Sequence, residues 1–76
     1  MDISGENAIV FYHKALELES HNPIIFNNLG NVYKDKGDIQ NAMDCYQKAL
    51  TLQPNYYLAM TNLGVIYQEQ GLLSRA

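Results

Sequence analysis

The sequence predicts an all-α protein in which antiparallel helix pairs stack into an α-solenoid. Three observations lead to this fold class. Helix-breaking residues divide the 76-residue chain into four segments of similar length. Apolar residues within each segment recur at intervals of three and four, the spacing of one helix face, and no segment shows the period of two typical of strands. The chain also repeats itself after 34 residues.

The first boundary separates segment 4–19 from segment 23–36. It carries Asn22 and Pro23. An asparagine side chain accepts a hydrogen bond from a free N–H group at a helix start, and proline lacks the N–H that would go unpaired there. A helix is therefore expected to begin at Pro23.

Gly37 and Asp38 mark the second boundary, after which segment 38–52 follows. Glycine readily takes the left-handed conformation that ends a helix, and aspartate caps the next one. We therefore expect a minimal loop between the second and third helices.

Pro54 and Asn55 form the third boundary, because proline cannot continue a helix interior. The fourth helix is expected over 57–70. Gly71 lies one repeat after Gly37 and is expected to end this helix in the same way.

The repeat is clearest where "FNNLGNVYKDKG" returns as "MTNLGVIYQEQG". A family pattern of W-x2-L-G-x2-Y, A-x3-F and P appears here as Phe26-x2-Leu29-Gly30-x2-Tyr33, Ala42-x3-Tyr46 and Pro54. The chain thus resembles the tetratricopeptide repeat family. The resemblance implies that one helix pair cannot cover its own apolar face, so the next pair covers it. It divides the chain into a second helix of a partial repeat (4–19), a full repeat (23–52) and a first helix of a partial repeat (57–76).

Small and bulky residues alternate at the positions where these helices are expected to meet. Gly30 and Ala42 allow paired helices to approach closely, because larger side chains would hold the backbones apart. Tyr33, Tyr46 and Tyr67 have two interpretations: they pack between helices, or they stack on a ligand.

Composition argues against catalysis and against several classes of partner. A formal charge of −3 gives no support for binding nucleic acid or an anionic membrane. The single Cys45 excludes a disulfide within the chain and a CxxC motif. His13 and His21 lack the i, i+4 spacing of a helical metal pair, and no glycine-rich phosphate loop is present. We expect no enzyme activity, no cofactor and no metal.

The apolar run at 8–12 is too short for a signal core or a membrane span. A soluble protein of the cytoplasm, or of both nucleus and cytoplasm, is the expectation.

One polar stripe suggests a binding face on the second helix. Three asparagines in one helix oppose helix formation, because their amides compete for backbone hydrogen bonds. In proteins that resemble tetratricopeptide arrays, this face lines a concave groove where asparagine amides bind an extended peptide. The alternative is a plain solvated face. The expected peptide-binding residues are Asn27, Asn28, Asn31, Lys34 and Asn62, with Asn28 and Asn62 continuing a ladder from repeat to repeat.

The partial repeats suggest self-association. Leu63, Ile66 and Tyr67 are expected to face an absent partner, so segment 4–19 of one molecule would dock on segment 57–70 of another. A homo-oligomer, closed or open, would result. The alternative is that the chain is a piece of a longer array.

The phrases "NNLG", "CYQKAL" and "NLGVIY" also resemble repeats that precede protein O-glycosyltransferases of the SPINDLY and O-linked N-acetylglucosamine transferase type. This likeness implies recruitment of substrate proteins for a catalytic domain. The favoured function is a non-catalytic scaffold that binds a peptide or protein segment. A structural self-assembling unit is the competing interpretation.

Overall fold

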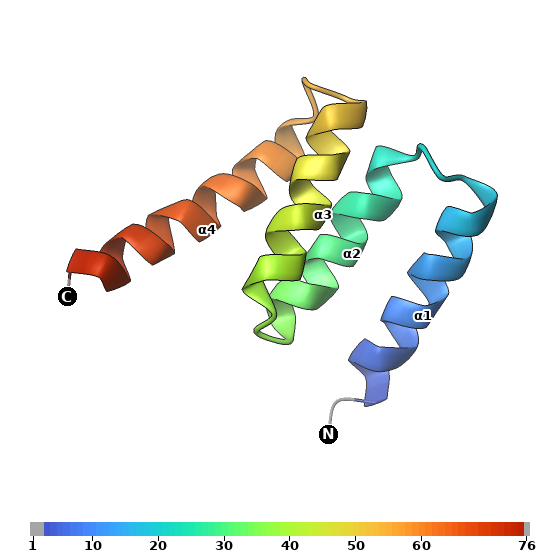
Figure 1. Cartoon of the computed structure of the whole chain (residues 1–76), viewed down its shortest axis with the longest axis horizontal. Helices are drawn as coiled ribbons and strands as arrows, with labels where there is room; N and C mark the ends of the chain where they lie inside the picture. The colour runs from blue at the N-terminus through green and yellow to red at the C-terminus, as the bar shows by residue number, and fades with distance from the viewer. Residues whose placement is uncertain (1–2, 76) are drawn as a thin grey trace.

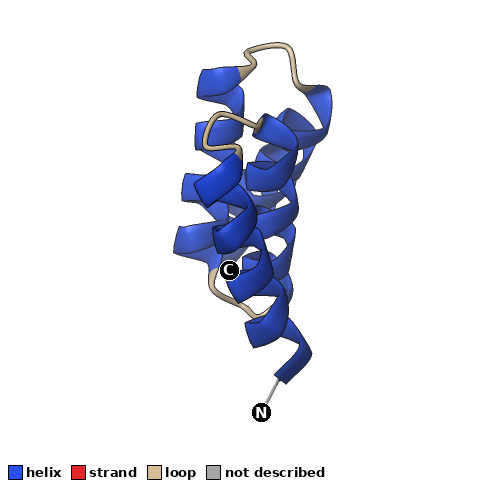
Figure 2. Ribbon diagram, turned by 90° about the vertical axis from the view of Figure 1, so that its right-hand side faces the viewer, coloured by secondary structure: helices blue, strands red, loops and turns tan. Residues whose placement is uncertain are grey.

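The computed structural model describes residues 3–75, with side chains described for 5–71. Four helices occupy this range and no strand does: α1 (Ile3–Leu18), α2 (Pro23–Asp35), α3 (Ile39–Leu52) and α4 (Tyr57–Arg75). Successive helices run antiparallel across a flattened molecule of 42 × 35 × 14 Å (Figure 1). Only short loops join them (Figure 2). The all-α prediction is confirmed.

The start of α2 follows from its cap. Asn22 has extended backbone angles, and its Oδ1 accepts a hydrogen bond from the Ile24 N–H at 2.9 Å. Pro23 occupies the first helical position, where a missing N–H leaves no bond unmade. The helix predicted to begin at Pro23 does begin there.

The loop between α2 and α3 has the geometry expected of its glycine. Gly37 has φ +83°, the left-handed region in which a Cβ would be strained. The Asp38 N–H donates to the Tyr33 carbonyl and the Gly37 N–H to the Lys34 carbonyl, so orphan carbonyls of α2 are satisfied. Asp38 then caps α3 by accepting from the Asn41 N–H.

The prediction that Gly71 ends the fourth helix is wrong. α4 continues to Arg75, and Gly37 alone among the described residues has positive φ. Glycine inside a helix costs about 1 kcal/mol relative to alanine. A single glycine at this modest cost does not end the helix, and the hydrogen-bond ladder of α4 continues through it.

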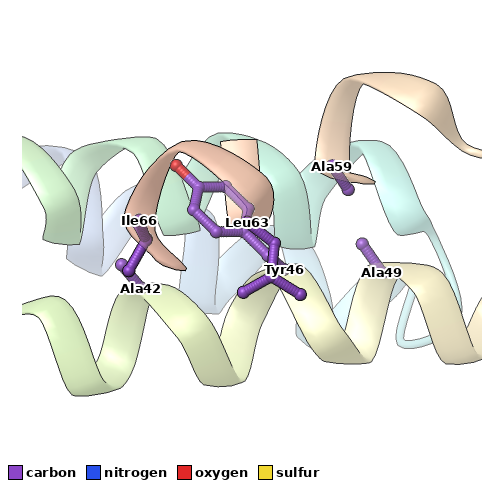
Figure 3. Close-up of a cluster of buried hydrophobic side chains, with 6 residues drawn as sticks. All are labelled: Ala42, Tyr46, Ala49, Ala59, Leu63 and Ile66. Atoms are coloured by element: carbon purple, nitrogen blue, oxygen red, sulfur yellow. The ribbon is translucent and has the colours of Figure 1, made fainter. Parts of the chain in front are cut away.

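The hydrophobic core lies between α3 and α4. Ala49 and Ala59, both fully buried, face each other across α3 and α4 (Figure 3). Tyr46 lies between this contact and the contact of Ala42 with Ile66. Each fully buried large side chain contributes roughly 1.5–3 kcal/mol. The buried cluster comprises Ala42, Tyr46, Ala49, Ala59, Leu63 and Ile66.

Leu63 and Ile66 are therefore not free for self-association. Their exposed fractions are 9% and 1%, because both pack against α3 within the same chain. The expectation that they face an absent partner is wrong for these two residues. Tyr67 differs, since 49% of it is exposed, and its hydroxyl accepts a hydrogen bond from Gln47 Nε2 of α3 at 3.2 Å.

α2 and α3 meet at the close approach predicted for Gly30. A Cβ built on Gly30 would lie 2.7 Å from Tyr46 Cε1 and 2.8 Å from Cδ1, closer than real carbon contacts. The absence of a side chain at Gly30 lets the Tyr46 ring lie directly on the α2 backbone. Tyr46 is fully buried, so it packs between helices and is not a stacking surface for a ligand.

Candidate functional site

The predicted binding residues include an amide cluster that joins three helices. Asn27 and Asn31 lie one turn apart on α2, and Asn62 reaches them from α4. Asn62 Nδ2 donates to Asn27 Oδ1 at 3.1 Å and to Asn31 Oδ1 at 3.2 Å. The Tyr46 hydroxyl of α3 donates to Asn31 Oδ1 at 2.6 Å. Two of the three asparagines that oppose formation of α2, Asn27 and Asn31, are thus compensated by hydrogen bonds between helices.

The predicted peptide contact required Asn27 to lie on an open face, but Asn27 is buried. It is 4% exposed, and its Oδ1 is occupied by Asn62. A buried polar group is costly unless it is hydrogen-bonded. The structure therefore uses Asn27 chiefly to tie α2 to α4.

Asn31 and Asn62 keep unused hydrogen-bonding capacity within the part of the chain that the structure describes. Asn31 Oδ1 accepts two bonds, but its Nδ2 donates to no described protein group. Both bonds made by Asn62 come from its Nδ2, which leaves its Oδ1 without a described donor. Both residues are partly exposed. Their adjacent amides thus offer one free donor group and one free acceptor, the complement of a peptide bond.

Asn28 and Lys34 lie beside this cluster and do not join it. Both are partly buried. Lys34 follows Asn31 by one turn on the same face of α2, whereas Asn28 is turned about 100° away from Asn27. Asn62 bonds to Asn27 and Asn31, and the ladder expected from Asn28 to Asn62 stays a prediction.

Sequence reasoning missed the part that Tyr46 plays in this cluster. Burial, followed by the charges of Asp35 and Cys45, raises the pKa of Tyr46 to about 12, so its hydroxyl stays protonated and donates to Asn31. The 34-residue register carried a signal for the Asn62 contacts, because it makes α2 and α4 equivalent helices of successive repeats, and stacked repeats contact their neighbours.

An open hollow in the described part of the molecule lies elsewhere. It is lined by residues of the α1–α2 turn, where Ser20 Oγ and His21 Nδ1 lie 3.0 Å apart. Its lining residues are Leu18, Glu19, Ser20, His21, Asn22 and Pro23. None of them belongs to the amide cluster, so the hollow and the candidate site are separate features.

Cys45 lies next to Tyr46 in α3 and is buried. Burial first, then the charges of Asp44 and Asp38, raises the pKa of this thiol from its ordinary value of 9.0 to about 11. The thiolate is the reactive form of cysteine. At neutral pH Cys45 is thus an unreactive packing residue.

The raised thiol pKa predicts a loss of stability in alkali. The stabilisation is fully present below pH about 9 and is lost as the pH rises towards about 11, because the unfolded chain releases this proton first. The free energy of unfolding in urea should therefore fall across this window, and less steeply in a Cys45→Ala variant. Equal slopes for the two proteins would contradict this assignment.

The described residues contain neither a candidate metal site nor a helix that could span a membrane. No group of three histidine, cysteine, aspartate or glutamate side chains there is arranged to hold a metal ion. No described helix has the length and apolar character needed to cross a membrane.

A model of the TPR repeat family matches residues 6–37 and again residues 30–71. The chain belongs to the TPR repeat family. TPR repeats generally mediate protein–protein interactions, and TPR domains are generally non-catalytic scaffolds. Among curated proteins none matches this TPR chain. The resemblance to SPINDLY and O-linked N-acetylglucosamine transferase repeats stays a prediction.

Proposed function

We propose that this TPR chain binds an extended segment of a partner protein across the face formed by α2 and α4. The observation that carries the proposal is the pair of free groups at Asn31 and Asn62. The Asn31 Nδ2 donates to a carbonyl of the bound segment, and the Asn62 Oδ1 accepts from one of its N–H groups. This pairing recognises backbone, so the ligand is an extended peptide.

The site is held in place before the ligand arrives. Asn31 is held by Tyr46 and Asn62, while Asn62 is held by Asn27 and Asn31. Because these side chains are already ordered, binding loses little of their conformational entropy. Asn28 and Lys34 lie at the margin of this face and extend it, with Lys34 favouring acidic side chains in the ligand. The cytoplasm, or nucleus and cytoplasm together, is the proposed setting.

The conservative variant Asn31→Asp tests the site. A carboxylate still accepts from Tyr46 and Asn62, so the fold keeps its hydrogen bonds, but the donor meant for the ligand is gone. A peptide array identifies a ligand, and titration calorimetry then compares affinities. We expect Asn31→Asp to weaken binding by about tenfold or more, since an unpaired peptide carbonyl costs roughly 1–3 kcal/mol.

Asn7→Asp provides the matched control, because it makes the same change of charge at an exposed position on α1. Its affinity should equal that of the wild type. Equal loss in both variants would mean that charge alone weakens binding, and unchanged affinity in Asn31→Asp would reject this site.

We propose self-association as a second role, and a specific observation favours it. Large apolar side chains are exposed on the two terminal helices, including Phe11 at 66% on α1 and Leu58 at 63% on α4. Exposed apolar surface of this kind marks contact sites between proteins. Light scattering over a range of concentrations tests this role, which predicts a mass above that of the monomer.

A further inference from the structure

α2 and α4 carry equivalent glycine packing sites. A side chain packs on the site of α2, whereas the site on the outer face of α4 is empty. Gly64 lies 34 residues after Gly30. At Gly30 a Cβ would meet the Tyr46 ring at 2.7 Å, whereas at Gly64 a Cβ would meet nothing within 4 Å. The same glycine thus faces a tyrosine in one repeat and open space in the next.

Exposed apolar residues flank Gly64. Met60 and Tyr67 are 47% and 49% exposed, and they lie on the same side of α4 as Gly64. Their equivalents on α2 are Phe26 and Tyr33, which are partly buried and pack against the α3–α4 core. The α4 face therefore has the residues of a helix-packing surface and lacks the helix.

The complementary surface lies on α1. Its equivalents of Ala42, Tyr46 and Ala49 are Ala8, Tyr12 and Ala15. The three α3 residues are fully buried, but the three α1 residues are only partly so. Tyr12 also supports Phe11, whose ring meets it edge to face at a centroid distance of 5.4 Å.

One repeated contact establishes which side of α1 is already in use. His13 Nε2 lies 3.3 Å from the Tyr33 hydroxyl, and 34 residues later Gln47 Nε2 lies 3.2 Å from the Tyr67 hydroxyl. α1 thus sits on α2 in the register in which α3 sits on α4. The side of α1 that would meet a preceding helix is the side that remains free.

We propose that the Gly64 face of α4 binds α1 of a second copy of this chain, with Tyr12 of that copy seated on Gly64. The inference rests on the proposed self-association and specifies its register. A second copy fits because this chain carries both halves of the α2–α3 interface in matching register. α1 and α4 lie at opposite ends of the molecule (Figure 1), so they meet only between copies.

The register brings a further polar contact into place. Within one chain, Asn62 donates a hydrogen bond to Asn27. One repeat earlier, the position of Asn62 is held by Asn28; one repeat later, the position of Asn27 is held by Thr61 on α4. Docking therefore places Asn28 of the second copy beside Thr61, where its Nδ2 can donate to the hydroxyl. The contact joins two different surfaces, so assembly proceeds head to tail.

Gly64→Ala tests the proposal because its two effects have opposite signs. In the free chain the new methyl meets nothing, and alanine favours the helix, so the dilute protein should melt at a higher temperature. In the assembly the methyl would strike Tyr12, and the association constant measured by sedimentation should fall about tenfold or more. Gly71→Ala is the control. Its repeat equivalent, Gly37, has no packed neighbour where a Cβ would stand, so a methyl at Gly71 should meet nothing in the assembly and association should persist.

A mixing experiment tests the head-to-tail arrangement. Gly64→Ala blocks one surface and Tyr12→Ser the other, and circular dichroism establishes that both variants remain helical. Each alone should be monomeric, whereas an equal mixture should form a heterodimer that does not grow. Such a heterodimer supports the proposal.

Three results would overturn it. If wild type associates and Gly64→Ala associates equally, self-association stands but the Gly64 register is wrong. A mixture that stays monomeric, or that grows without limit, rejects the head-to-tail contact. A wild-type chain that stays monomeric at every concentration means that the face serves another occupant, and self-association fails with it; peptide binding at Asn31 is independent of each outcome.

Discussion

Replacing Tyr46 with alanine is expected to destabilise the domain by about 3–5 kcal/mol, the usual cost of removing a buried aromatic side chain. Tyr46 is fully buried between α2 and α4 and its ring lies on Gly30. A domain of this size has a total stability of roughly 4–11 kcal/mol. Urea unfolding followed by circular dichroism, at a concentration where the chain is monomeric, should therefore show a greatly lowered midpoint.

Tyr46→Phe is the matched variant, because it keeps the ring and removes only the hydroxyl. It should cost about 1 kcal/mol, the net value of the lost hydrogen bond to Asn31. The difference between the two variants then measures the contribution of ring burial. If alanine were tolerated as well as phenylalanine, the ring would not be the centre of this core.

Gly30→Ala is expected to have the second-largest effect, a loss of about 1–3 kcal/mol from overpacking. The added methyl would lie 2.7 and 2.8 Å from two atoms of the Tyr46 ring. The ring has little freedom to retreat, since α4 packs on its other side. The melting temperature should fall, although alanine is the better helix former.

Gly64→Ala makes the same chemical change at the equivalent position of the next repeat. Apart from the adjacent backbone of α4 itself, no atom lies within 4 Å of its new methyl, so this variant should gain up to about 1 kcal/mol in the dilute chain. Opposite signs at two equivalent glycines would show that packing against Tyr46 outweighs helix propensity at Gly30, whereas propensity alone acts at Gly64. A shift in the same direction for both would contradict this account.

The stability variants bear on the proposed binding face as well. The Tyr46 hydroxyl donates a hydrogen bond to Asn31 Oδ1, which also accepts one from Asn62 Nδ2. We therefore regard Tyr46 as a positioning residue for the peptide site, because it acts through Asn31. A change that loosens Tyr46 weakens the site without touching the ligand.

Local features of the sequence predicted the helix starts and the loop between α2 and α3. Asn22 caps α2, Gly37 takes positive φ and Asp38 caps α3, as their chemistry requires. Each depends on atoms within a few residues of the chain. The repeat register likewise predicted that Gly30 and Ala42 lie where helices approach closely.

Predictions that depended on neighbours distant in the sequence did less well. Gly71 was expected to end a helix in the same way as Gly37, but it lies inside α4, and Gly37 alone among the described residues has positive φ. Leu63 and Ile66 were assigned to an exposed face, whereas α3 covers them. The free apolar side of α4 holds Met60 and Tyr67 instead.

The sequence by itself determined the helices, their caps, the 34-residue register and the small residues at helix contacts, because these follow from local geometry and side-chain size. Only the tertiary structure decided which asparagine atoms are hydrogen-bonded and which glycine has a side chain packed on it. Asn27 and Asn62, which are 35 positions apart in the chain, are hydrogen-bonded. The Tyr46 ring packs on Gly30, whereas no side chain packs on Gly64. Hydrogen-bond partners and steric neighbours at such separations exist only after the helices have packed.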